Sequence, residues 1–367
     1  MTKTKKIILW SVIGVVGVIL LLALVFLCIY ASRLSTVSSI AKITSYNDGF
    51  DIYTMDVKYD YSIEDIISHG IENNQDVFDA IMQESLPLLP VNIQAPSFGC
   101  SAFGMTTTDG THLMGRNYDF KKNTSAMLVY CSPKNYYKSV AFAALNNLSA
   151  DQPLSSTTKK LATLAAPFVC LDGINEKGVS IAVLVVDSDP VFQQTDKDAI
   201  FTTLAIRLVL DRAATTDEAV ELLKGYDMFA SSGKDYHFYV NDAQGNGKVI
   251  EWDCENPTRE LVATPVDVVT NFYTIYADKV LPDQKNGIYG HGKERYNYIK
   301  QVFAEQEGNL TNKTAWDALK AASQDPSETD ITSNTQWSIV FDNTNLTAEI
   351  VLRRNWNDVH KFSVFGN

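Results

Sequence analysis

An uninterrupted apolar run near the N-terminus constrains this chain more than any other feature. Residues 7–30 contain no charged side chain, and only Ser11, Gly14 and Gly17 interrupt the bulky apolar residues. As a helix with a rise of about 1.5 Å per residue, this run is roughly 36 Å long, whereas the hydrocarbon core of a bilayer is about 30 Å thick. The sequence therefore predicts a transmembrane helix over residues 7–30.

The charges beside this run predict its orientation. Lys3, Lys5 and Lys6 precede it, and only Arg33 follows closely. Because cytoplasmic flanks are enriched in basic residues, we expect residues 1–6 to be a cytoplasmic tail and the remainder to lie outside the membrane.

Two alternatives to a retained signal-anchor fit less well. A cleaved signal peptide has an apolar region of about 7–15 residues and a small-residue cleavage site, which Ala31-Ser32-Arg33 matches poorly. A buried core helix that is apolar all round and this long is unusual. We therefore expect a single-pass protein of the cell membrane.

The composition of the 367-residue chain is that of a globular protein, with 46% apolar and 20% charged residues. The net charge of −12 argues against nucleic acid as a partner, because phosphate binding requires a basic surface. Of five cysteines, Cys28 lies in the apolar run, and the other four have no zinc-site spacing.

Beyond the apolar run, the pattern predicts a tether over residues 30–43 and helices over residues 61–90, broken near Gly70 and Asn73. Pro87, Pro90 and Pro96 then predict extended chain up to Gly99. After Gly99 the pattern changes to strands separated by turns. The further elements are a buried strand over 179–186, a helix or helix pair over 202–225, and hairpins over 237–253 and 336–353. Strands with interspersed helices indicate an α+β fold.

A hairpin that begins at Cys100 places chemically useful groups together. Asp109-Gly110 separates strands predicted over residues 100–108 and 111–120, and a two-residue turn there pairs Cys100 with Asp119. Regular alternation then puts Arg116 on the opposite face, so that a bulge is needed to bring it to Cys100.

A carboxylate beside a thiol disfavours the thiolate, so Asp119 alone does not activate Cys100, whereas Arg116 acts in the right direction. If Cys100 becomes an N-terminus, its α-amine, with a pKa near 8, takes the thiol proton. This interpretation predicts cleavage between Gly99 and Cys100, with residues 31–99 as tether and prosegment. The alternatives are an inert strand cysteine and a Cys-His dyad, although none of the five histidines lies in a recognisable motif.

These residues resemble a known family. Cys100-Ser101-Ala102-Phe103, the Asp109-Gly110 turn and the segment 115–120 are similar to the N-terminal nucleophile hydrolases of the choloylglycine hydrolase family, which includes bile salt hydrolases, penicillin V acylases and acid ceramidase. The segments 172–178, Thr270-Asn271 and 292–296 resemble further family segments in the right order.

The resemblance implies a four-layer αββα sandwich over residues 100–367 and a preceding prosegment that is cut by self-cleavage, with its retention on the mature protein left open. The pattern over residues 61–90 predicts that this prosegment is mostly helical. The resemblance makes Cys100 the nucleophile, Asp119 the group that orients the amine, and Arg116 the residue that steadies the sulfur. It also makes Asn175 and Asn271 oxyanion donors, and Arg295 a support for the carboxylate. From the residues alone, Asn175 could equally hold a hairpin turn, and Asn271 could cap a strand end.

The expected function is that of a membrane-anchored, extracytoplasmic amidase that hydrolyses a small linear N-acyl amide through a Cys100 thioester. The amide would be of the bile-salt, N-acyl amine or acylated amino acid type. The resemblance implies no metal or organic cofactor, and the oligomeric state is left open. Two alternatives stand beside it: an acyltransferase of the same fold, and a surface-anchored binding protein with an inert Cys100.

Overall fold

Two β-sheets form the centre of the protein in the computed structural model, which describes residues 3–87, 99–150, 154–230, 233–329 and 333–366. Among the described residues, the larger sheet has nine strands in the order β1-β2-β5-β6-β7-β8-β11-β12-β13. Its strands are β1 (Ala41–Lys42), β2 (Ile52–Val57), β5 (Ala126–Cys131), β6 (Ser139–Ala144), β7 (Asp172–Asn175), β8 (Ser180–Val186), β11 (Asp235–Asn241), β12 (Gly247–Trp252) and β13 (Leu261–Pro265).

The smaller sheet has six strands in the order β14-β3-β4-β15-β16-β17. Its strands are β14 (Val268–Val269), β3 (Gly99–Thr106), β4 (His112–Asp119), β15 (Thr335–Asp342), β16 (Thr347–Leu352) and β17 (His360–Ser363). A separate parallel pair consists of β9 (Ala199–Phe201) and β10 (Asp227–Phe229).

Helices cover the outer faces of the two sheets, which pack against each other through β3 and β8. On the larger sheet, α5 (Thr202–Arg212) contacts β7 and β8, and α6 (Thr216–Lys224) contacts β11 and β12. On the smaller sheet, α7 (Lys293–Glu305) contacts β14, and α8 (Asn312–Ala322) contacts β4 and β15. Four short helical segments lie between the described strands: η1 (Leu145–Leu148), α4 (Thr157–Ala162), η2 (Thr163–Phe168) and η3 (Thr274–Lys279). The predicted α+β class is confirmed.

Several predicted elements are confirmed. All seven residues of β8 are buried, as the continuous apolar run over residues 179–186 predicts. The segment 202–225 forms the helix pair α5 and α6, and β11 with β12 and β15 with β16 are the two later hairpins. The extended stretch predicted before Gly99 lies mostly outside the described residues.

The hairpin at Cys100 is present, but its predicted register is wrong by one residue. Cys100 pairs with Tyr118, and Gly99 pairs with Asp119. The reason is the turn: the Thr107 amide bonds to the Thr111 carbonyl, so the loop has three residues and not two. Gly110 lies at its end with φ +86°, a left-handed conformation that glycine adopts without strain.

The corrected register brings Arg116 to the right face without a bulge. Arg116 pairs with Ala102, and side chains two residues apart on a strand share a face, so Ala102 and Cys100 point the same way. Cys100, Tyr118 and Arg116 therefore lie on one face of the hairpin, and Asp119 lies on the other.

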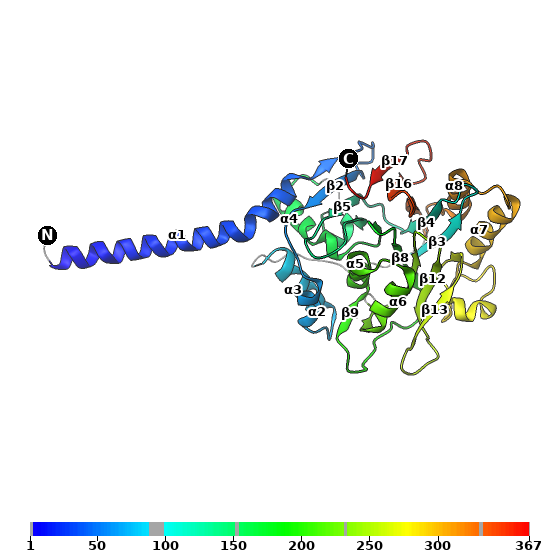
Figure 1. Ribbon diagram of the computed structural model, residues 1–367, viewed down its shortest axis with the longest axis horizontal. Helices are drawn as coiled ribbons and strands as arrows, with labels where there is room; N and C mark the ends of the chain where they lie inside the picture. The colour runs from blue at the N-terminus through cyan, green and yellow to red at the C-terminus, as the bar shows by residue number, and fades with distance from the viewer. Residues whose placement is uncertain (1–2, 88–98, 151–153, 231–232, 330–332, 367) are drawn as a thin grey trace.

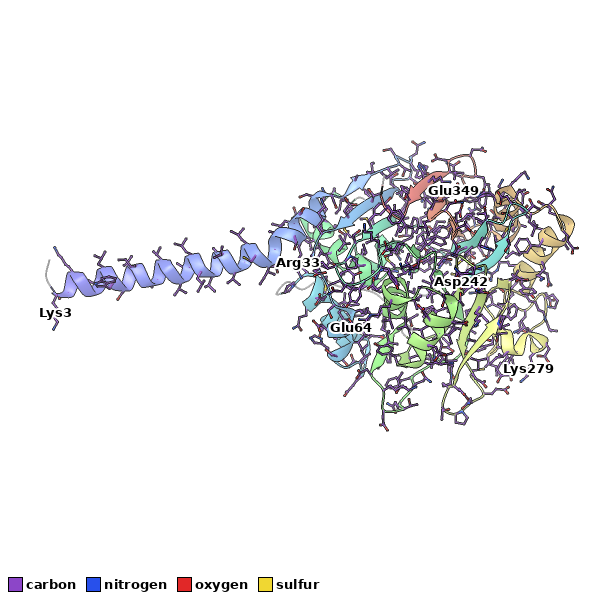
Figure 2. The ribbon with its side chains drawn as sticks, in the orientation of Figure 1. Lys3, Arg33, Glu64, Asp242, Lys279 and Glu349 are labelled. Atoms are coloured by element: carbon purple, nitrogen blue, oxygen red, sulfur yellow. The ribbon has the colours of Figure 1, made fainter. Side chains whose placement is uncertain are left out.

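The apolar N-terminal run forms one helix, α1 (Lys3–Ser38), which projects from the body (Figure 1). It is long and apolar enough to cross a membrane, a test that signal sequences also pass. The helix does not end in a tether. Its last turns dock on the body, and Arg33 lies at this junction (Figure 2). Arg33 Nε donates to the Ser85 carbonyl at 2.8 Å, and the Thr36 hydroxyl accepts from the Lys58 amide at 2.8 Å.

Residues 39–87, the described part of the segment between α1 and Gly99, belong to the core and are not mostly helical as expected. This segment contains the predicted helices α2 (Ile63–Ser68) and α3 (Asn74–Ser85), which Ser62 and Asn73 cap. It also contributes β1 and β2 to the larger sheet, where β2 runs parallel to β5 along its whole length. Hydrogen bonding to a strand far along the chain therefore holds this segment on the body.

Candidate active site

Cys100 is buried at the start of β3, with both of its backbone groups hydrogen-bonded to side chains. Its amide donates to Asn271 Oδ1 at 3.0 Å, and its carbonyl accepts from Arg295 Nη1 at 2.6 Å. Burial raises the pKa of the thiol to about 12, although nearby Arg116 acts to lower it. The thiol is therefore protonated at neutral pH while the chain is continuous through Gly99.

Arg116 is held beside Cys100 by a buried ion pair. Its Nε lies 2.6 Å from Asp172 Oδ2, and its Nη2 donates to the Val183 carbonyl at 3.1 Å. Burial raises the pKa of Asp172 to about 6, against the lowering effect of the guanidinium. Because Asp172 also accepts from Trp337 Nε1 at 3.2 Å, its carboxylate is fixed in position, and through it Arg116 is fixed as well.

Asp119 lies on the opposite face of the hairpin from Cys100 and Arg116 and is held by polar side chains of its own. Its carboxylate accepts from the Thr335 hydroxyl at 2.6 Å and from Gln324 Nε2 at 2.9 Å, and it lies 3.6 Å from Arg295 Nη1. Burial raises the pKa of Asp119, and the Arg295 guanidinium opposes that rise. Asp119 is thus linked to Cys100 through Arg295.

Arg295 contacts Cys100, Asn271 and Asp119 at once. At the start of α7, it contacts the Cys100 carbonyl and Asp119, and its Nη2 donates to Asn271 Oδ1 at 2.7 Å. The helix is preceded by Gly292, with φ +84°, where a Cβ atom would lie 2.3 Å from the guanidinium. Only glycine fits there without displacing Arg295.

Asn271 presents its oxygen, and not its nitrogen, to Cys100. Because a guanidinium can only donate, the atom of Asn271 that faces Arg295 is Oδ1, which also accepts from the Cys100 amide. Its Nδ2 donates to the Val185 carbonyl at 2.8 Å. The geometry therefore favours a role in holding the Cys100 nitrogen over the expected role of oxyanion donor.

Asn175 is not brought to Cys100 by any described contact. Its Oδ1 accepts from the amides of Lys177 and Val179, both at 3.0 Å. Its Nδ2 donates to the carbonyls of Leu210 and Ala213 at 3.1 and 2.8 Å. These four bonds fill the capacity of the amide, so the structure favours the alternative that Asn175 holds a hairpin turn and docks it on α5.

Sequence reasoning missed three residues of this network. Asp172 begins the family-like segment 172–178, and an acid beside a glycine within a strand was the available signal. Thr335 and Gln324, which hold Asp119, lie more than 200 residues from it, and no local pattern marks them.

A comparison with protein-family models gives one match. Residues 100–272 match the linear amide C–N hydrolases, choloylglycine hydrolase family. This segment belongs to the choloylglycine hydrolase family. The protein is accordingly a hydrolase of linear amide C–N bonds, and the part of the hairpin that carries Cys100, Arg116 and Asp119 lies within the matched residues. No curated protein matches the chain.

Solved structures agree with this family at the level of the fold. A mutant of the conjugated bile acid hydrolase from Clostridium perfringens is 16% identical, with a TM-score of 0.54, and the match covers 73% of this chain and 94% of that chain. A second variant of that hydrolase is 15% identical, with a TM-score of 0.55 and coverages of 72% and 93%. The penicillin V acylase from Agrobacterium tumefaciens is 17% identical, with a TM-score of 0.52 and coverages of 72% and 86%.

The burial of Cys100 leads to a first prediction. In the continuous chain, we expect iodoacetamide at pH 8 to alkylate Cys100 at least about tenfold more slowly than Cys254, because the thiolate is the reacting form. Cys254 is only partly buried and serves as the internal control. The measurement is peptide mass mapping of chain taken from a short cell-free synthesis, before any cleavage. Equal labelling of the two cysteines would contradict the buried, neutral thiol.

The ion pair between Asp172 and Arg116 leads to a second prediction. Because the pKa of Asp172 is raised to about 6, its carboxylate loses its charge as the pH falls through that value, and its hold on Arg116 weakens. We expect kcat to fall below pH 6, and Asp172→Asn to be slower by about tenfold at pH 7 and to lack this acidic limb. The same acidic limb in the variant would show that another group causes it.

Proposed function

We propose that the protein is a membrane-anchored, extracytoplasmic amidase whose nucleophile is Cys100 after cleavage of the Gly99–Cys100 bond. The single observation that carries the proposal is the position of the Cys100 backbone nitrogen, which lies on Asn271 Oδ1 within a buried network of Asp119 and Arg295. A buried backbone amide needs one acceptor, and Asn271 Oδ1 is that acceptor in the continuous chain. The α-amine that cleavage would create there needs acceptors for its protons.

Cleavage follows from the groups already present. The Cys100 thiol attacks the Gly99 carbonyl, its proton passes to the departing Cys100 nitrogen, and the Gly99 acyl group moves from nitrogen to sulfur. Water then hydrolyses this thioester, which frees the Gly99 carboxylate, the thiol and the α-amine. The amine, with an ordinary pKa near 8, is a base that the amide was not.

In turnover, the α-amine takes the proton of the Cys100 thiol, and the thiolate attacks the carbonyl carbon of the substrate amide. The C–N bond breaks, the substrate amine leaves with the proton, and the acyl group remains as a Cys100 thioester. Water hydrolyses that thioester and restores the thiol. Arg116 stabilises the sulfur as it gains negative charge, since its guanidinium is held on that face by Asp172.

The substrate class and the location rest on less direct support. The family acts on linear amides, so we propose an N-acyl amide of the bile-salt, N-acyl amine or acylated amino acid type. The length and apolarity of α1 support anchoring, and the lysines at its start support a cytoplasmic N-terminus.

N-terminal sequencing and intact mass measurement of the purified protein test the proposal. We expect a mature chain that begins at Cys100 and hydrolyses one or more amides of the three types. We expect only uncut, inactive chain for Cys100→Ala. Uncut wild-type chain that hydrolyses amides would overturn the role of the α-amine, and cleavage in Cys100→Ala would overturn self-cleavage.

A further inference from the structure

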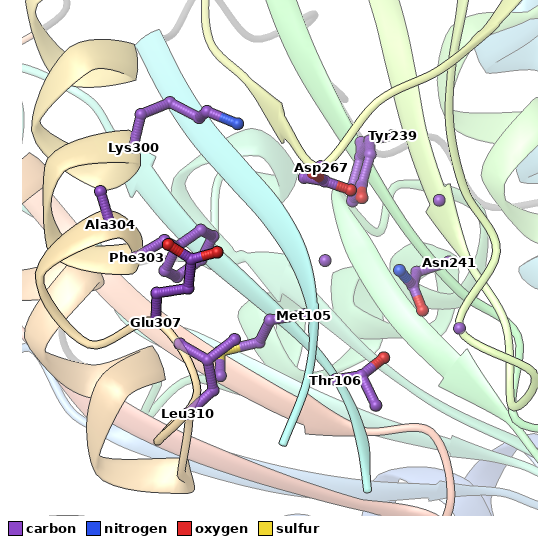
Figure 3. Close-up of a pocket in the computed structure, with 13 residues that line it drawn as sticks. Met105, Thr106, Tyr239, Asn241, Asp267, Lys300, Phe303, Ala304, Glu307 and Leu310 are labelled. Carbon is purple, nitrogen blue, oxygen red and sulfur yellow. The ribbon is translucent and has the colours of Figure 1, made fainter. Parts of the chain in front are cut away.

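One face of strand β11 carries buried polar side chains that have no part in the proposed reaction so far. His237, Tyr239 and Asn241 alternate along the strand, so their side chains share a face. Tyr239 and Asn241 line a cavity of about 430 Å³ at the far end of β3 from Cys100 (Figure 3). His237 lies nearer the start of β11 and is fully buried. A buried polar side chain at this point needs hydrogen-bond partners.

Both ring nitrogens of His237 face oxygen atoms. Nε2 lies 2.8 Å from the carbonyl oxygen of Thr270, and Nδ1 lies 3.4 Å from Glu251 Oε2. Because a carbonyl can only accept, Nε2 carries a proton and the imidazole donates to Thr270. Thr270 directly precedes Asn271, whose Oδ1 accepts from the Cys100 amide. The imidazole therefore fixes the backbone next to the residue that holds the Cys100 nitrogen.

Glu251 holds the chain on the other side of Asn271. Its buried carboxylate accepts from the backbone amides of Thr274 and Ile275, both at 2.9 Å, and it orients the imidazole of His237. The buried pair of His237 and Glu251 thus contacts the backbone both before and after Asn271. The position of Asn271 between these contacts follows from them.

Thr270 connects this pair to Arg295 as well. The Thr270 hydroxyl donates to the Gly292 carbonyl at 2.9 Å, and Gly292 is the residue before α7. Arg295, which contacts the Cys100 carbonyl, lies in the first turn of that helix. One residue therefore connects His237 to both side chains that contact the backbone of Cys100.

We propose that His237 is a positioning residue for the proposed amide hydrolysis. Its Nε2–H group holds the Thr270 carbonyl, so that Asn271 Oδ1 stays on the Cys100 nitrogen before and after that nitrogen becomes an amine. The proposal rests on the proposed function, because it assigns a role in that reaction. Loss of the contact displaces a reacting group, and a displacement of about 1 Å can cost about 100-fold in rate.

Two substitutions of His237 separate its two ring nitrogens. Glutamine places an amide N–H group near the position of Nε2, whereas asparagine places a polar group near Nδ1 and does not reach Thr270. We expect His237→Gln to keep kcat for a hydrolysed amide within about threefold of wild type. We expect His237→Asn to lower kcat at least about tenfold with KM unchanged, since the loss affects the transition state and not substrate binding.

Tyr239→Phe is the matched control, measured beside both variants together with thermal unfolding. The Tyr239 hydroxyl donates to the Val266 carbonyl at 3.0 Å, so this variant also removes a buried bond from β11 to the segment that precedes Asn271. It should leave kcat within about twofold of wild type. An equal loss of kcat in His237→Gln and His237→Asn, or an equal loss in Tyr239→Phe and His237→Asn, would overturn the positioning role.

Hydrogen exchange measures the hold on the Cys100 nitrogen without any reaction. Cys100→Ala keeps the backbone amide at this position in an uncut chain. With His237→Asn added, we expect that amide to exchange at least about tenfold faster, and with His237→Gln added we expect little change. Unchanged exchange with His237→Asn would overturn the proposal. A wild-type chain that hydrolyses no amide would overturn the proposed function, and the exchange rates would still show whether His237 holds Asn271.

Discussion

Replacing Arg295 with methionine is expected to lower kcat for amide hydrolysis by at least about 100-fold and to slow cleavage at Gly99 as strongly. The guanidinium holds the Cys100 carbonyl, Asn271 Oδ1 and Asp119 at once. Its loss leaves the Cys100 carbonyl without its donor and Asn271 Oδ1 held only by the Cys100 amide. Displacement of a reacting group by about 1 Å can cost about 100-fold in rate. Methionine keeps most of the apolar volume of the side chain.

The measurement is kcat with one hydrolysed amide, together with the fraction of chain that begins at Cys100. Asn297→Ala, an exposed position on the same helix, is the matched control and should retain full activity. Thermal unfolding of both variants accompanies the assay, because loss of one partner of a buried ion pair costs about 3–5 kcal/mol. A folded Arg295→Met protein with near wild-type kcat would show that Arg295 is not needed to position Cys100.

The sequence predicts the hairpin that carries Cys100, yet not its register. The Asp109-Gly110 signal places a turn, but the same two residues fit a two-residue loop and the last positions of a three-residue loop. The choice depends on hydrogen bonds of Thr107 and Thr111 that the pattern does not show. That one-residue difference decides whether Arg116 or Asp119 shares a face with Cys100.

The roles of the two asparagines illustrate a different limit. The position of Asn271 in the site was predictable from its family-like segment, but its orientation depends on Arg295, which lies 24 residues further along the chain. Asn175 lies in an equally recognisable segment, and its amide is used by backbone groups of its own turn and of α5. A motif thus predicts which residues to consider, while the hydrogen bonds show which groups each side chain contacts.

The two strands of the N-terminal segment could not be predicted from the sequence, because the strand that β2 pairs with is remote along the chain. Helices α2 and α3 were predictable, since caps and apolar spacing are local signals. Strand β2 pairs with β5, which begins at Ala126. The local sequence around β2 therefore contains no signal for this pairing. Burial of Ile52 and Met55 makes this segment as much a part of the core as the later strands.

We expect the two pieces of a cleaved chain to remain together under native conditions. All six residues of β2 pair with β5, and α1 and α3 add further contacts to the body. Release of the N-terminal piece would expose the paired edge of β5 and the apolar side chains that cover it, at a cost of about 25 cal/mol per Å² of apolar surface. Size-exclusion chromatography should show one peak that contains both pieces, and separation should require denaturant.

Met55→Asp should disrupt this association, because it buries a carboxylate without a partner in the larger sheet. We expect a loss of more than about 4 kcal/mol of folding free energy, seen as aggregation or a much lower Tm. Asp56→Asn changes the next residue of the same strand, whose side chain is exposed, and should alter stability by less than about 0.5 kcal/mol. If Met55→Asp left both stability and co-elution unchanged, β2 would be a removable addition to the sheet.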